Sequence, residues 1–209
     1  MRDKIKATAT KLLIEHGHHR LRFSDIADEL GITRANIHYH FGTKNKLVDE
    51  VLTEYVVNTT GKMAAVWCST MTYEEKVIAT MELNRKQYLR FNKSNEVGGA
   101  PWSMISRMRL EAKSVGPEAR ASMLAFSRAV EGYVASAIAQ AQANGEIAKD
   151  APVNDIAVQI VSIIESAGPI TQDAGSFARL EHLYLAHMRV ISHAYVTKRK
   201  RTPRALRAV

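Results

Sequence analysis

Residues 24–41 constrain the fold of this chain more than any other segment, because they predict two short helices joined by a glycine. Ser24 is a favourable N-cap for the first helix, and Gly31 supplies the residue that tolerates positive φ at its end. Ile37 and Phe41 stand four residues apart, so they share the buried side of the second helix. Two helices held by a small apolar contact, with a polar face left free, predict a helix-turn-helix.

The second helix of this motif would present its polar face to the major groove of DNA. In helix-turn-helix proteins the first residues of this helix contact base edges. Arg34 suits guanine, and Asn36 suits adenine, because each forms paired hydrogen bonds with that base. The Ala35 methyl group would meet a thymine methyl, and Tyr39 points outward from the same face. We therefore predict base contacts from Arg34, Ala35, Asn36 and Tyr39.

Contacts to DNA phosphates are expected at the margins of the same helix. Thr33 is its predicted N-cap, and it lies with His38 and His40 at positions suited to the DNA backbone. For the two histidines the alternative is local capping of the helix by the imidazole.

Lys44 and Lys46 give an independent indication of a phosphate site. Thr43 is the predicted N-cap of the next helix, so both lysines fall in its first turn, where positive charge opposes the helix dipole. A bound phosphate would reverse that penalty, because helix N-termini attract anions. The alternative is a solvated pair in which Asp49 or Glu50 neutralises these lysines.

At this point the chain resembles the TetR family of bacterial transcriptional regulators. The resemblance runs over residues 5–47 and rests on the spacing of Phe23, Ile26, Ala27, Leu30, Gly31, Thr33, Ile37, His40, Phe41, Lys44 and Leu47. The chain departs from the family at His38, where the family usually has tyrosine. The resemblance implies a homodimer formed through the last two long helices, a small-molecule pocket in the second domain, repression, and a phosphate contact from Lys44.

The periodicity predicts an all-α protein of about nine helices. We expect a helix-turn-helix domain at 1–50, a helical effector-binding and dimerisation domain at 51–197, and a basic, disordered tail at 198–209. The expected helices cover residues 3–16, 24–30, 34–41, 44 to beyond 56, 73–92, 102–115, 117–143, 153–167 and 176–197. Gly168 and Pro169 are expected to end one helix, and Ser176 to cap the next.

The net charge of +8 does not by itself indicate DNA binding, because most of it lies in the tail. Residues 1–60 carry nine Lys/Arg against eight Asp/Glu, and residues 61–196 carry fourteen against thirteen. The last thirteen residues hold six basic side chains and no acid. This tail would either add nonspecific affinity for DNA or only keep the protein in solution; its position after the dimerisation helix favours the second role.

Two helices near the C-terminus have apolar residues around most of their circumference. This distribution predicts burial on two sides, once inside the subunit and once against a second copy, giving a four-helix dimer interface. The alternative is a core helix within one subunit. The predicted interface residues are Ile156, Ile160, Ile163, Ile164, Leu180, Leu183, Tyr184 and Ile191.

A methionine-rich and aromatic region predicts a pocket for a small, mainly apolar molecule, because methionine adapts to irregular ligands. The alternative for each residue is ordinary core packing. The candidate lining residues are Met63, Trp67, Met81, Tyr88, Trp102, Met104, Met108, Phe126 and Tyr133.

The remaining patterns favour a regulator over other classes. The single cysteine, Cys68, suits the cytoplasm, and we find no export signal and no apolar run long enough for a membrane span. No spacing of ligands or nucleophiles predicts a metal, a cofactor or catalysis. The expected function is a cytoplasmic homodimeric repressor that binds a palindromic operator and is released by a small ligand. Alternatives are a DNA-binding regulator controlled by a protein partner and, less favoured, a small helical enzyme; Glu131 and Glu165 are its only remote acid–base candidates.

Overall fold

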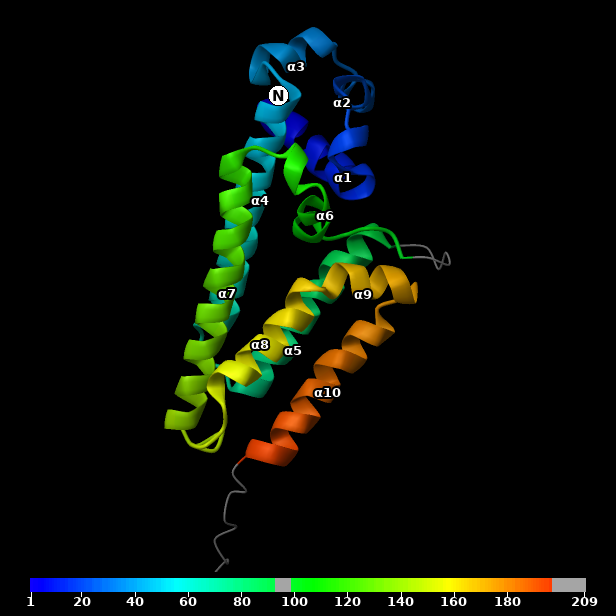
Figure 1. The fold of residues 1–209 in the computed structure, drawn as a ribbon. Helices are drawn as coiled ribbons and strands as arrows, with labels where there is room; N and C mark the ends of the chain where they lie inside the picture. The colour runs from blue at the N-terminus through cyan, green and yellow to red at the C-terminus, as the bar shows by residue number, and fades with distance from the viewer. Residues whose placement is uncertain (93–98, 197–209) are drawn as a thin grey trace, which may run out of the picture.

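The computed structural model describes residues 1–92 and 99–196, and over these residues the chain is all-α (Figure 1). The described part holds ten α-helices and one short 3₁₀ helix. They are α1 Arg2–Arg20, α2 Phe23–Leu30, α3 Arg34–Phe41, α4 Lys44–Trp67, α5 Tyr73–Phe91, α6 Met104–Leu110, η1 Ala112–Ser114, α7 Pro117–Ala143, α8 Val153–Glu165, α9 Ala167–Ala174 and α10 Ala178–Tyr195. The predicted basic tail, 198–209, lies outside the described residues.

Helices α1 to α3 form a small bundle at one end of the molecule, which we call the headpiece (Figure 1). Ile26 of α2 and Ile37 of α3 are fully buried, and Phe41 is nearly so. Gly31 adopts the left-handed conformation at φ 63°, and the Ile32 N–H then donates to the Ala27 carbonyl at 3.0 Å. The predicted helix-turn-helix is confirmed.

The predicted N-cap of α2 is wrong. The helix begins at Phe23, one residue early, and Arg22 occupies the cap position with no side-chain hydrogen bond. Ser24 is therefore inside the first turn, where its hydroxyl donates to the Asp25 carboxylate at 3.2 Å. Gly17 does end the regular part of α1, at φ 79° and ψ 175°, before a last short turn.

Helix α4 connects the headpiece to the rest of the chain without a break. The Thr43 hydroxyl accepts a hydrogen bond from the Lys46 N–H at 3.3 Å, so the predicted cap is confirmed. The helix then runs alongside α7 for much of its length (Figure 1). The predicted domain boundary, near residues 48–60, falls inside this single helix.

The second half of the chain differs from the predicted layout in three places. Helix α6 is shorter than expected, and the one-turn helix η1 follows it. Gly168 and Pro169 do not end a helix; they lie in the first turn of α9, which was not predicted. Proline is tolerated there because a first-turn residue has no intrahelical partner for its N–H. Phe177 precedes α10, so Ser176 is not its cap.

The core runs continuously from the headpiece into the helices below it. Leu47 and Leu52 of α4 are fully buried, as are Met108 of α6 and Val130 of α7. Helix α6 lies between the headpiece and the lower helices (Figure 1) and packs against α1, α4 and α9. None of the described helices is long and apolar enough to cross a membrane.

Candidate nucleic-acid interface and internal cavity

The four predicted base-contact residues share the solvent face of α3. Arg34, Ala35 and Asn36 are exposed, and Tyr39 is 86% exposed, the highest value among the exposed large hydrophobic side chains. Thr33 caps the helix, because its hydroxyl oxygen accepts from the Asn36 N–H at 3.3 Å. This leaves the hydroxyl proton of Thr33 free to donate to a phosphate.

The two histidines of α3 differ in their surroundings. Nδ1 of His38 donates to the Gly42 carbonyl at 2.8 Å, and its ring packs edge-on against Phe23 at 4.8 Å. The alternative of local capping therefore applies to His38, and of its two ring nitrogens only Nε2 is left for a contact to DNA. His40 is half-buried, with its ring between those of Tyr39 and Phe41.

An arginine at the start of the chain fixes the end of α3. Nη1 of Arg2 donates to the His40 carbonyl at 2.5 Å, and Nη2 pairs with Glu50. The same guanidinium lies 4.2 Å above the centre of the Phe41 ring. Sequence reasoning missed Arg2, because its three partners are distant in the chain and no local pattern links them.

Lys44 and Lys46 lie at the start of α4, as predicted. Asp49 and Glu50, their alternative partners, are engaged elsewhere: Asp49 accepts from the Gly116 N–H at 2.7 Å, and Glu50 pairs with Arg2. Within residues 1–92 and 99–196, neither lysine forms an ion pair. Burial lowers the pKa of Lys44, and the nearby Glu111 carboxylate opposes that shift. The structure therefore leaves a partly desolvated cation at a helix N-terminus, where a phosphate would bind favourably.

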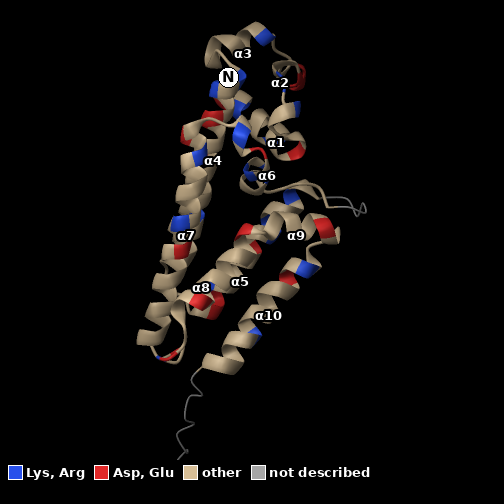
Figure 2. Cartoon of the chain, viewed as in Figure 1, with Lys and Arg blue, Asp and Glu red and all other residues tan. Residues whose placement is uncertain are grey.

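Lys and Arg positions are interspersed with Asp and Glu positions along the helices of the headpiece (Figure 2). This agrees with the nearly balanced charge of residues 1–60. Any preference for DNA therefore depends on the geometry of α3 and the start of α4.

A cavity of about 570 Å³ lies below the headpiece, bounded by α1 and by α4 to α8. Three of the predicted pocket residues line it: Met63, Trp102 and Phe126. The other six do not line this cavity and lie in the packed interior or at its edge: Trp67, Met81, Tyr88, Met104, Met108 and Tyr133. For those six the alternative of core packing agrees with the structure.

The cavity wall is more polar than the sequence predicted. Arg109 of α6 lines it, and Nη2 of this residue donates to Glu165 at 2.9 Å and to Ser127 at 2.7 Å. Burial raises the pKa of the Tyr55 phenol. The charge of Arg90 and hydrogen bonds with Met104, Gln87 and Thr59 lower this pKa and so offset part of the rise. Polar side chains from α4, α5 and α6 therefore line the cavity beside the predicted methionine and aromatic residues.

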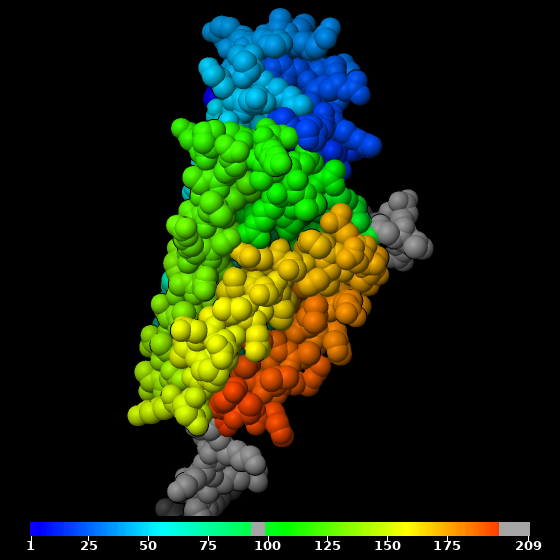
Figure 3. Space-filling model, in the orientation of Figure 1, coloured from blue at the N-terminus to red at the C-terminus, as the bar shows by residue number. Residues whose placement is uncertain are grey.

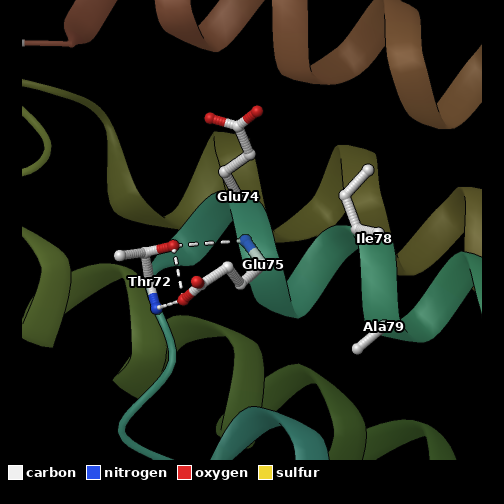
Figure 4. Close-up of a pocket in the computed structure, with 5 residues that line it drawn as sticks. All are labelled: Thr72, Glu74, Glu75, Ile78 and Ala79. Atoms are coloured by element: carbon white, nitrogen blue, oxygen red, sulfur yellow. Dashed lines mark hydrogen bonds between the residues drawn. The ribbon is translucent and has the colours of Figure 1, made fainter.

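A second depression, of about 470 Å³, lies at the start of α5 (Figure 4). Two of its three polar residues, Thr72 and Glu75, form a capping box. The Thr72 N–H donates to the Glu75 carboxylate at 2.8 Å, and the Glu75 N–H donates to the Thr72 hydroxyl oxygen at 3.3 Å. These groups satisfy one another, so the depression has an ordinary structural explanation.

Six of the eight predicted dimer residues are buried inside the single chain, which corrects that prediction. Helices α5, α7 and α9 pack against α8 or α10 and cover these side chains. The six are Ile156, Ile160, Ile164, Leu180, Tyr184 and Ile191. Ile163 and Leu183 are half-buried, while Val158 and Val190 remain exposed on the outer sides of α8 and α10.

Within the described residues, no group of three or more His, Cys, Asp or Glu side chains is placed to hold a metal ion. Glu165, the acid considered for catalysis, is paired with Arg109, and Glu131 is exposed on α7. Cys68, the single cysteine of the sequence, is exposed after α4.

An all-α chain with an exposed recognition helix at one end defines the class of helix-turn-helix DNA-binding regulators. Residues 5–51 match the family model described as bacterial regulatory proteins, tetR family. No protein of curated function matches the sequence. Residues 5–51 are therefore similar to the DNA-binding region of TetR-family transcriptional regulators.

Solved structures share the fold over almost the whole chain. A TetR-family transcriptional regulator from Agrobacterium tumefaciens has a TM-score of 0.78 and 17% identity, covering 91% of this chain and 96% of the other. A proposed regulator from Saccharomonospora viridis, solved in complex with choline, has a TM-score of 0.73 and 24% identity, covering 94% and 98%. The reduced form of NemR from E. coli has a TM-score of 0.73 and 14% identity, covering 90% and 95%.

Proposed function

We propose that this protein is a homodimeric repressor that binds a palindromic operator in the bacterial cytoplasm and is released by a small molecule. The observation that carries the proposal is the exposed face of α3, where Arg34, Asn36 and the large aromatic side chain of Tyr39 are all open to solvent. Side chains of these types, placed on a recognition helix, read base edges in the major groove.

Dimerisation would occur on the outer faces of α8 and α10. These helices lie next to each other on one side of the molecule (Figure 3), and Val158 and Val190 expose 54% and 59% of their surface there. Half-buried Ile163 and Leu183 would complete the contact. A two-fold interface of this kind would set the two headpieces for successive major grooves, about 34 Å apart.

Helix α6 would transmit ligand binding to the headpiece. Arg109 and Ser106 of α6 line the cavity, while Glu111, at the end of the same helix, accepts a hydrogen bond from the His19 N–H of α1 at 3.2 Å. Asp49 of α4 holds the segment after η1 through Gly116. A ligand that displaces α6 would therefore tilt the headpiece, and a small change in spacing is enough to lose the operator.

Selection of DNA from a random pool by the purified full-length protein tests the proposal. We expect one inverted repeat to be enriched, with half-sites about one helical turn apart or a small multiple of it, bound by an even number of chains in sedimentation. A pool without an enriched repeat, at physiological salt, would contradict the proposal.

A further inference from the structure

The residues that line the cavity carry an excess of positive charge. Four of its nineteen lining residues are Lys or Arg, and one is acidic. The four cations come from three helices: Lys62 of α4, Lys86 and Arg90 of α5, and Arg109 of α6.

The single carboxylate does not balance these cations. Glu165 accepts from Nη2 of Arg109 at 2.9 Å, so its charge is already used by one of them. Among the described residues, the other guanidinium nitrogens of Arg109 make no hydrogen bond. A half-buried guanidinium with free donors on a cavity wall is suited to a carboxylate, which accepts two parallel hydrogen bonds.

A second cation lies close to a phenol that lines the same cavity. The charge of Arg90 acts on the Tyr55 phenol, which lines the cavity together with Gln87. Tyr55 and Gln87 can donate hydrogen bonds to an anion that Arg90 attracts. Together with Arg109 these residues give the cavity several hydrogen-bond donors, while its one carboxylate is already paired.

Apolar side chains also line the cavity. Met63, Trp102, Ile105 and Phe126 line it, and all four are buried. A volume of about 570 Å³ is within the range that encloses a drug-sized ligand, and a flexible hydrocarbon chain would fit between methionine and aromatic side chains.

We infer that the effector of this protein is an amphipathic anion, with a carboxylate head on Arg109 and Arg90 and a hydrocarbon tail against Trp102 and Phe126. The inference rests on the proposed function for its biological meaning, though not for its chemistry. This ligand class differs from that of the choline-bound structure from Saccharomonospora viridis. Choline is a cation, and the Lys and Arg residues that line this cavity would repel it.

Calorimetric titration of the full-length protein without DNA tests this inference. The probes are decanoate, decanol and decyltrimethylammonium, which share a tail and differ in head charge, together with choline. We expect decanoate to bind at least tenfold more tightly than decanol, the equivalent of one charge-assisted hydrogen bond. Equal or tighter binding of decanol, decyltrimethylammonium or choline overturns the inference, as does no binding of decanoate at ~1 mM.

Variants locate the head group. Arg109→Gln and Arg90→Gln should each weaken decanoate binding about tenfold and leave decanol unchanged. Arg90 is exposed, so its variant keeps the test valid if loss of the Arg109–Glu165 pair impairs folding. Arg128→Gln is the matched control, because Arg128 is exposed on α7 and does not line the cavity. Decanoate affinity that both cavity variants retain places the head elsewhere and overturns the assignment.

The two proposals fail separately. If decanoate binds as expected but selection enriches no operator, the proposed function is wrong and the ligand class stands. If an operator is enriched and decanoate neither binds nor releases it, the ligand class is wrong and the DNA-binding function stands.

Discussion

The hydroxyl of Tyr73 lies 2.6 Å from Nε2 of His187, joining the start of α5 to α10 in the interior. Both side chains are buried, and His187 is only 6% exposed. Burial lowers the pKa of His187 to about 4, because a charged imidazole cannot be solvated there. Burial also raises the pKa of Tyr73, so both groups are neutral at physiological pH.

We predict that His187 makes the protein less stable as the solution becomes more acidic. Between the ordinary histidine pKa of about 6.5 and the folded value, the unfolded chain binds a proton that the folded chain does not. Stability therefore falls with falling pH, by about 2 kcal/mol between about pH 7 and pH 5 from this residue alone. Urea unfolding at both values measures it.

Two variants distinguish the contribution of His187 to this pH dependence from that of the other titrating groups. In His187→Gln the pH dependence should shrink by about 2 kcal/mol, while His182→Gln, exposed on the same helix, should keep it. If His187→Gln unfolds with the same pH dependence as the natural protein, His187 is not the group that titrates.

The helices whose bounds were predicted correctly begin and end at residues whose effect depends only on their neighbours in the sequence. Helix α7 has its predicted bounds because Pro117 begins it and Gly145 follows its end at φ 74°. Gly31 and Thr33 likewise act within one or two turns. Helix α9 was missed because Gly168 and Pro169 usually interrupt a helix, and only tertiary packing of Thr171 and its neighbours shows that they begin one.

The same distinction separates the two sites. The exposed face of α3 could be predicted, because helical spacing turns Ala35 and Tyr39 away from Ile37, while Arg34 and Asn36 stand in the exposed first turn. The cavity wall could not, because it combines residues of six helices, and whether a methionine faces a void or a neighbour depends on packing. Glu165 gave one weak signal, since it is the one ionisable residue between Asp155 and Asp173. Arg109 gave none, because Arg107, Glu111 and Lys113 stand close to it in the sequence.

We expect that the headpiece requires glycine at position 31 because of its backbone conformation, and not because a side chain would lack space there. A Cβ there would meet no atom within 4 Å, but φ is +63°. Gly31→Ala should therefore cost about 1 kcal/mol of unfolding free energy, the price of a left-handed side chain. Gly132→Ala is the control, because Gly132 is equally open but helical, and there alanine should stabilise by up to about 1 kcal/mol. Thermal unfolding measures both, and effects of the same sign would contradict this explanation.

Arg34 is expected to determine sequence preference more than overall affinity. Arg34→Ala should lower the preference for one base pair in each half-site by about 1–3 kcal/mol, because a paired hydrogen bond to guanine is lost. Competition binding with every single-base operator variant measures this. The control Arg128→Ala, at an exposed position of α7, should change none of these preferences between base pairs. An equal loss of affinity for all sequences would show that Arg34 contacts phosphate instead.

Lys44 is expected to act on the DNA backbone. Its side chain is half-buried at the start of α4, and burial lowers its pKa against the opposing charge of Glu111. A phosphate would restore the favourable environment that burial removes. Lys44→Ala should weaken binding to operator and random DNA alike and reduce the slope of log K against log salt by about one unit. Lys113→Ala, exposed on η1, should leave the slope unchanged. Titrations at several salt concentrations measure the slope, and an unaltered value for Lys44→Ala would rule out a phosphate contact at this residue.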